Sequence, residues 1–180
     1  MDPTPGKEPG SGGWSSGSAG PAKGPSRCLM SHRPWCFPLV VEDDDDFALL
    51  LQRAFGKAGV PGGNVRRYSD GESAVLDLRA APIVRPSLLT LDMELPGMSG
   101  LAVLERLRSL GSFATLPAFF ISGRTESSLI SSAYALRARG YWAKPQNLRD
   151  LQVIVDGMLE FLEHSEPTGL PLSIRDPRAI

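Results

Sequence analysis

The side chains of this sequence that could do chemistry stand directly after short apolar runs. They are Glu42, Asp43, Asp92, Ser122 and Lys144. Carboxylates packed close together repel one another unless a cation lies among them. Hard oxygen ligands in small number, with water completing an octahedron, suit Mg²⁺. If the fold brings these residues together, they indicate a site for a divalent cation.

The same residue types could also transfer a phosphoryl group. A carboxylate such as that of Asp92 can attack phosphorus and form an aspartyl-phosphate. A metal ion and an ammonium group, here Lys144, neutralise charge on the oxygens of the group in transfer. The hydroxyl of Ser122 can donate a hydrogen bond to a further oxygen. The parts needed for phosphoryl transfer are therefore all present.

Alternating apolar patterns predict the elements that position these residues. Short apolar runs are expected to form strands over 37–41, 65–68, 88–91, 116–121 and 140–143. Continuous apolar character is typical of strands buried on both faces, as in a parallel sheet. Apolar stripes at helical spacing lie between and after them, within 47–55, 74–78, 101–110, 129–133 and 148–162. Gly59 is the expected end of the first helix.

Five strands alternating with five helices predict a doubly wound α/β domain, with helices on both faces of a five-stranded parallel sheet. In such folds the reactive groups collect just beyond the carboxyl ends of the strands. We therefore expect the acidic residues, the serine and the lysine to meet at one edge of the sheet.

Composition and length limit what surrounds this domain. The chain has 180 residues, of which 42% are hydrophobic and 22% charged, and its net charge is −1. This balance is typical of one globular domain and gives no bulk field for nucleic acid or an anionic membrane. Residues 1–36 are rich in Gly, Pro and Ser and are predicted to be disordered. The folded domain is expected over 37–163, followed by a short tail over 164–180.

The cysteines and the apolar pattern favour the cytoplasm as the location. Cys28 and Cys36 form neither a disulfide framework nor a four-ligand metal spacing. No apolar run approaches the length of a membrane span, and no signal-peptide pattern begins the chain.

Three motifs resemble the receiver domains of two-component response regulators, especially stand-alone regulators of the chemotaxis type. The motifs are Leu39-Val40-Val41-Glu42-Asp43-Asp44, the run Leu91-Asp92-Met93-Glu94-Leu95-Pro96-Gly97-Met98-Ser99-Gly100, and Lys144-Pro145. The resemblance covers residues 37–163, and the motifs occur in the order that the family shows. It implies the flavodoxin-like receiver fold.

The resemblance also implies a role for each site residue. Asp92 would accept the phosphoryl group. Asp43, Asp92 and the backbone carbonyl of Glu94 would bind Mg²⁺ or Mn²⁺, with Glu42 acting through water. Ser122 and Lys144 would hold phosphate oxygens. Ser122 would also work as a switch with Tyr141, whose ring would turn inward from an exposed rotamer. The Lys144–Pro145 peptide bond would be cis.

The partners implied are those of a phosphorelay. A sensor histidine kinase or a histidine phosphotransfer protein would supply the phosphoryl group. A downstream protein, or a second copy of the chain, would bind the face made by the fourth helix, fifth strand and fifth helix. Direct binding of nucleic acid or membrane is not expected. Gln146 stands where receivers usually have Phe, Arg137 stands where Gly is usual, and Trp142 is expected to point away from Tyr141.

Other interpretations exist for the same residues. The acidic run 43–46 could be a solvated loop, with Asp46 as a helix cap. Ser122 could start a helix, and Tyr141 could be an ordinary core residue. The sequence Asp92-Met93-Glu94 also resembles the Asp-x-Asp nucleophile of haloacid-dehalogenase-type phosphohydrolases, but there the nucleophile lies on the first strand. A degenerate receiver that only docks proteins stays open as the alternative function.

Overall fold

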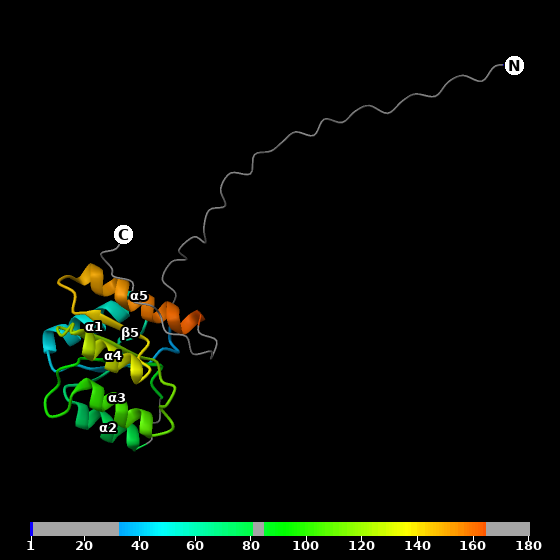
Figure 1. The fold of residues 1–180 in the computed structure, drawn as a ribbon. Helices are drawn as coiled ribbons and strands as arrows, with labels where there is room; N and C mark the ends of the chain where they lie inside the picture. The colour runs from blue at the N-terminus through cyan, green and yellow to red at the C-terminus, as the bar shows by residue number, and fades with distance from the viewer. Residues whose placement is uncertain (2–32, 81–84, 165–180) are drawn as a thin grey trace.

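A computed structural model describes residue 1, residues 33–80 and residues 85–164 of the chain (Figure 1). Its strands form one parallel sheet in the order β2-β1-β3-β4-β5. Their bounds are β1 (Pro38–Val41), β2 (Arg66–Tyr68), β3 (Leu88–Leu91), β4 (Ala118–Ser122) and β5 (Gly140–Ala143). The predicted five-stranded parallel sheet is therefore confirmed.

Helices follow the strands in strict alternation. They are α1 (Asp45–Lys57), α2 (Gly71–Arg79), α3 (Gly100–Ser109), α4 (Ser127–Ala135) and α5 (Leu148–His164), with a short 3₁₀ turn η1 over Gly62–Asn64. Helices α1 and α5 cover one face of the sheet, and α2, α3 and α4 cover the other. None of the described helices is long and apolar enough to cross a lipid bilayer.

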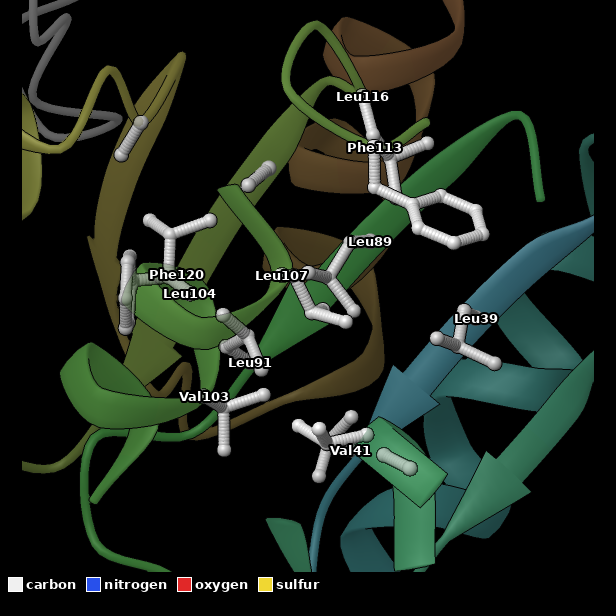
Figure 2. Packing of buried hydrophobic residues seen from close by; sticks show 14 of the residues in the cluster. Leu39, Val41, Leu89, Leu91, Val103, Leu104, Leu107, Phe113, Leu116 and Phe120 are labelled. Carbon is white, nitrogen blue, oxygen red and sulfur yellow. The ribbon is translucent and has the colours of Figure 1, made fainter. Parts of the chain in front are cut away.

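Two hydrophobic cores lie on opposite faces of the sheet. Side chains of successive strand residues point to opposite faces, so each central strand supplies both cores. In β1, for example, Leu39 packs toward α2 and α3, whereas Val40 packs toward α1 and α5. Figure 2 shows the first core, where Leu89 and Leu91 lie close to Leu107 of α3. Burial on both faces explains why the central strands appear as continuous apolar runs.

The predicted strand over 65–68 differs from the others. It is not a buried apolar strand, because β2 lies at the edge of the sheet with Arg66 exposed and Arg67 half-buried. An edge strand has a neighbour on one side only, so its charged side chains can reach water. The two arginines are compatible with this position and would be costly in a central strand.

The folded unit begins earlier than residue 37. Cys36 is fully buried, and the amide of Asn64 donates a hydrogen bond to its carbonyl over 3.1 Å. Arg33 donates its backbone N–H to the carbonyl of Gly59 over 2.8 Å and pairs with Glu163 of α5 over 2.8 Å. The prediction of disorder up to residue 36 is therefore wrong for residues 33–36. The rest of that segment, and the tail beyond residue 164, lie outside the described residues.

The capping of α1 also differs from expectation. Asp44, not Asp46, is the N-cap, because its carboxylate accepts from the backbone N–H groups of Asp46 and Phe47. This leaves Asp46 inside the first turn, where a negative charge is favourable. The helix ends as predicted before Gly59, which has a positive φ of 88°.

Candidate functional site

Strand register places Glu42 and Asp92 side by side. β1 and β3 are neighbours, and Val41 at the end of β1 pairs with Leu91 at the end of β3. The next residues, Glu42 and Asp92, therefore leave the sheet at the same level. Both are buried, with Glu42 2% and Asp92 6% exposed.

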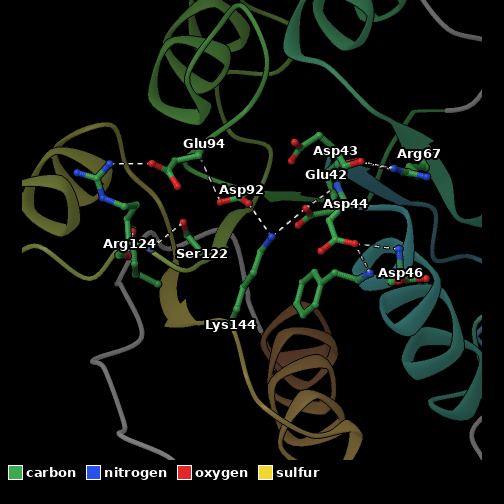
Figure 3. A network of polar contacts seen from close by, with 12 residues as sticks. Glu42, Asp43, Asp44, Asp46, Arg67, Asp92, Glu94, Ser122, Arg124 and Lys144 are labelled. Atoms are coloured by element: carbon green, nitrogen blue, oxygen red, sulfur yellow. Dashed lines mark hydrogen bonds and ion pairs between the residues drawn. The ribbon is translucent and has the colours of Figure 1, made fainter.

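The same register brings the lysine to these acids. Ser122 at the end of β4 pairs with Ala143 at the end of β5, and Lys144 follows. The Lys144 Nζ lies 2.7 Å from Asp92 Oδ2 and 2.9 Å from Glu42 Oε1. Dashed lines in Figure 3 mark both contacts. One ammonium group thus bridges two buried carboxylates that are far apart in the sequence.

Glu42, Asp43 and Asp92 form a cluster that fits a divalent cation. One carboxylate oxygen from each residue lies within 4.8 Å of the others. Asp43 is exposed, so the cluster opens to solvent on its side. Three hard oxygen donors with access to water are the ligand set that Mg²⁺ or Mn²⁺ prefers. The backbone N–H of Glu94 donates to Asp92 Oδ1 over 3.2 Å, which fixes the carboxylate from the other side.

The charges in this cluster do not balance. Burial raises the pKa of the Glu42 carboxyl above its usual range, despite hydrogen bonds from Lys144 and the backbone of Asp44. Burial alone would lower the pKa of Lys144, but hydrogen bonds to Asp92 and Glu42 outweigh burial and raise it. One ammonium group is thus shared by two buried carboxylates. A second cation would relieve the excess negative charge.

Arg67 fixes the loop between β1 and α1 and was not identified from the sequence. Its Nε and Nη2 atoms donate to the backbone carbonyl of Glu42, both over 3.0 Å, and Nη2 also donates to that of Asp43 over 3.1 Å. Its Nη1 pairs with Asp45 at 2.5 Å. A charged residue inside a predicted strand was the available signal, because such a residue needs a partner.

Ser122 and Tyr141 lie on the other side of Asp92. Ser122 is fully buried, and its Oγ accepts from the backbone N–H of Arg124 over 3.2 Å. The Tyr141 ring is only 4% exposed and stacks on Phe120, its partner in the β4–β5 pairing, at 5.6 Å. The expectation of an exposed Tyr141 rotamer is therefore wrong for this structure. Stacking on Phe120 buries the ring, and its hydroxyl donates to the carbonyl of Arg124 over 2.5 Å.

Two further expectations concern β5 and the residues after it. Trp142 points away from Tyr141, as predicted, and packs on Phe119 in the core under α5 at 5.8 Å. The Lys144–Pro145 peptide bond is trans, so the expected cis bond is not found. With this trans bond, the Lys144 ammonium group reaches both of its acidic partners.

Arg124 is the second residue that sequence reasoning missed. It follows β4 by two residues and pairs through Nη1 with Glu94 at 2.7 Å, a contact that Figure 3 marks. Its Nε pairs with Glu126 at 2.6 Å. A single arginine in a loop between a strand and a helix carries no pattern, so no signal in the sequence marks it.

Five parallel strands with a lysine-bridged acid cluster at their carboxyl ends define a class of phosphoryl-signalling domains. The family model of the response regulator receiver domain matches residues 39–156. The chain therefore belongs to the response regulator receiver family. Receiver domains serve two-component signalling through phosphorylation and are signalling domains, not enzymes in the usual sense.

Curated relatives support this assignment. The chain is 28% identical over 126 residues to the "Probable methanogenesis regulatory protein FilR2" of Methanothrix harundinacea, which covers 68% of this chain and 81% of FilR2. It is 27% identical to the DNA-binding transcriptional regulator NtrC of Klebsiella pneumoniae over 74% of this chain. That match covers only 27% of NtrC.

Solved structures share the fold. The phosphorylated cyanobacterial phytochrome response regulator RcpA is 31% identical, with a TM-score of 0.64, over 71% of this chain and 93% of RcpA. The Mn²⁺-bound form of response regulator Rcp1 is 25% identical, with a TM-score of 0.61, over 72% of this chain and 96% of Rcp1.

Proposed function

We propose that this chain accepts a phosphoryl group on Asp92 in a reaction that depends on Mg²⁺ or Mn²⁺. The observation that carries the proposal is the bridge from Lys144 to Asp92 and Glu42, which with Asp43 place one carboxylate oxygen each within 4.8 Å of one another. A degenerate receiver would have no need to keep two buried carboxylates on one ammonium group, because that arrangement is costly to bury.

The donor is a phosphohistidine of a sensor histidine kinase or of a histidine phosphotransfer protein. A carboxylate oxygen of Asp92 attacks phosphorus, a P–O bond forms, the P–N bond breaks, and the imidazole leaves with the electron pair. Lys144 exchanges its contact with Asp92 for a phosphoryl oxygen, and the Ser122 hydroxyl donates to another. Both groups neutralise charge that the reaction moves onto these oxygens.

The metal site uses groups at the ends of β1 and β3. Asp43, Asp92 and the backbone carbonyl of Glu94 would hold the ion directly, and Glu42 would act through water. When bound, the ion supplies positive charge to the oxygens of the group in transfer. Three carboxylates gather around the single ammonium group of Lys144, which is consistent with a further cation at this place.

Phosphorylation then changes a protein-binding face made by α4, β5 and α5. Ser122 and Tyr141 couple the two places, because both contact the backbone of Arg124, three residues before α4 begins. We infer a downstream protein or a second copy of the chain as the partner, in the cytoplasm, without direct contact to DNA or membrane. The acidic strand ends support this view, since they would repel phosphate-rich surfaces.

Intact-mass measurement after incubation with phosphoramidate and Mg²⁺ tests the acceptor. The wild-type chain should gain one phosphoryl group, which base should remove, and Asp92→Asn should gain none. Asp46→Asn is the matched control, because Asp46 is an exposed acid in the first turn of α1, outside the carboxylate cluster. If the wild-type chain gains no phosphoryl group with Mg²⁺ or Mn²⁺, the docking module is the better function.

Ser122→Ala tests the switch separately. The variant should still take up the phosphoryl group on Asp92, because Ser122 does not form the new bond. It should lose most of the phosphorylation-dependent change in dimerisation or partner affinity. A phosphorylated Ser122→Ala chain that changes as fully as wild type would exclude this route of coupling.

A further inference from the structure

Arg124 holds two acids at the rim of the site, across Asp92 from Lys144 (Figure 3). Its guanidinium pairs with Glu94, which follows Asp92 by two residues, and with Glu126, which directly precedes α4. These pairs are exposed: the side chain of Arg124 is 44% exposed, that of Glu94 64% and that of Glu126 49%. Exposed ion pairs contribute little free energy, so they can exchange partners readily.

The backbone of the same residue contacts both members of the proposed switch. The Arg124 N–H donates to Ser122 Oγ over 3.2 Å, and the Arg124 carbonyl accepts from the Tyr141 hydroxyl over 2.5 Å. Arg124 therefore touches the acceptor loop, the serine, the tyrosine and the start of α4. Lys144 pairs with Asp92 itself, and Arg124 pairs with Glu94 in the segment that follows Asp92.

A phosphoryl group on Asp92 would be a stronger partner for this guanidinium than either glutamate. It carries close to two negative charges and three acceptor oxygens. A guanidinium can bind such a group through two parallel N–H donors, whereas Glu94 and Glu126 each accept from only one nitrogen of Arg124. The arginine side chain starts two residues after Ser122, whose Oγ accepts from the Arg124 backbone N–H over 3.2 Å. Redirecting the guanidinium from the glutamates to Asp92 is the step that the inference adds.

We propose that Arg124 is a second phosphoryl-binding cation, held by Glu94 and Glu126 in the unphosphorylated chain and transferred to the phosphoryl group on Asp92. The inference rests on the proposed function of Asp92 and adds to it a named ligand of the phosphoryl oxygens. The transfer removes an ion pair from Glu126 at the start of α4. It thereby links the charge on Asp92 to the face that binds partners.

The test is the affinity of the full chain for trifluoroberyllate, which takes the place of a phosphoryl group on a carboxylate, measured with Mg²⁺ by calorimetry. Arg124→Ala should weaken binding about tenfold, the size expected for a hydrogen-bonded charge, and Arg124→Lys should weaken it less. Glu126→Gln should strengthen binding about twofold to threefold, because it releases the guanidinium. Arg53→Ala, which removes an exposed arginine of α1, is the matched control and should leave affinity unchanged.

The opposite signs separate this role from a purely structural one. If the ion pairs only held the loops in place, Arg124→Ala and Glu126→Gln would both weaken binding. If the negative charge of Glu126 weakened binding without acting through Arg124, Glu126→Gln would strengthen binding even when Arg124 is already replaced by Ala. The proposal expects no such gain in the Arg124→Ala, Glu126→Gln double variant. Either result would overturn the inference, as would wild-type affinity in both Arg124→Ala and Arg124→Lys.

The same binding experiment gives a different result if the proposed function itself is wrong. In that case the wild-type chain would show no trifluoroberyllate binding that depends on Asp92, and the inference would fall with it. Binding that Asp92→Asn abolishes and Arg124→Ala leaves unchanged would overturn the inference alone.

Discussion

Helices α1 and α4 both begin at the reactive edge of the sheet, yet they are held to the domain very differently. Five residues of α1 are buried: Phe47, Ala48, Leu51, Ala54 and Phe55. In α4 only Ala133 is buried, and the hydroxyl of Tyr134 is buried without a hydrogen-bond partner. The two helices therefore differ in the apolar surface that anchors them.

The residues that cap the two helices also favour α1 over α4. A carboxylate of Asp44 caps the start of α1, whereas Glu126 at the start of α4 makes no side-chain cap. Gly59 follows α1 with a positive φ, and at the equivalent position after α4 stands Arg137, with φ of 62°. Glycine adopts this conformation freely, whereas an arginine does so at a cost.

In the proposed function, this difference separates the residues that would bind metal and the phosphoryl group from those that would respond to phosphorylation. Glu42 and Asp43 lead into the firmly packed α1, so the groups that would hold metal and phosphoryl oxygens keep their geometry. Ser122 and Arg124 lead into the weakly anchored α4, so a new charge on Asp92 can change it at low cost. Elements that move in signalling are expected among the less stable parts of a fold.

Core truncation should show the contrast most strongly. Phe55→Ala in α1 should lower the free energy of unfolding by about 3–5 kcal/mol, because it leaves a cavity in a sealed core. Leu129→Ala in α4 should cost about 1 kcal/mol, since Leu129 is half-buried and its surroundings can close over it. Urea unfolding with unchanged slopes measures both values. Equal costs would mean that α4 is packed as firmly as α1.

Metal binding should further stabilise the part of the site that leads into α1, and so increase its difference from α4. At 100 times its Kd, Mg²⁺ should stabilise the chain by about 2.7 kcal/mol, because it binds the folded state alone. Asp43→Ala should remove this gain, and Asp46→Ala, outside the carboxylate cluster, should keep it. Thermal melts with and without Mg²⁺ provide the measurement. A wild-type midpoint that does not respond to Mg²⁺ argues against a metal site before α1.

Acid should have a smaller effect at the same site in metal-free protein. Because the pKa of Glu42 is raised above its ordinary 4.5 in the fold, the folded state takes up this proton at a higher pH than the unfolded chain. The charged Glu42 therefore destabilises the fold at neutral pH, and this penalty fades as pH falls toward 4.5.

Glu42→Gln is the variant that isolates this penalty. It should be more stable than wild type at pH 7, and the difference should shrink as pH falls toward 4.5, where the unfolded chain also takes up the proton. The contribution of Lys144 stays constant in this window, because its pKa is raised above 10.5. Chemical unfolding with a chelator present, repeated across the window, gives the difference. A gap that grows as pH falls would reverse the assigned direction.

Much of the fold was predictable because the information is local. The apolar run Leu88–Leu91 coincides with β3. Each apolar stripe at helical spacing falls on one of the helices α1 to α5. Parallel strands bring their carboxyl ends to one edge, so residues that follow apolar runs had to meet there. The close approach of Lys144 to Asp92 follows from that topology.

The parts that were missed depend on partners distant in sequence or on single residues. Residues 33–36 are held by loops from several parts of the chain, and no periodic pattern reports such contacts. In the run Asp43–Asp46 each acid is an acceptable cap, so the backbone alone decides for Asp44. Arg124 gains its importance only from the residues that the fold places around it.

The smallest expected effect comes from the residue that ends α4. Replacing it should make α4 more nearly as stable as α1. Both helices close with the same backbone hydrogen bonds, Val60 N–H to the Phe55 carbonyl and Ala138 N–H to the Ala133 carbonyl, each 3.0 Å. Arg137→Gly should raise the free energy of unfolding by about 0.5 kcal/mol, because relief of the left-handed strain exceeds the added entropy of the unfolded chain. Gly59→Ala should lower the free energy of unfolding at α1 by about 1 kcal/mol.

Thermal melts measure both changes, with Arg137→Ala as the control that removes the side chain and keeps the backbone strain. Should Arg137→Gly and Arg137→Ala be equally stable, backbone strain would not explain why α4 is the weaker helix, and its few buried side chains would have to account for it alone.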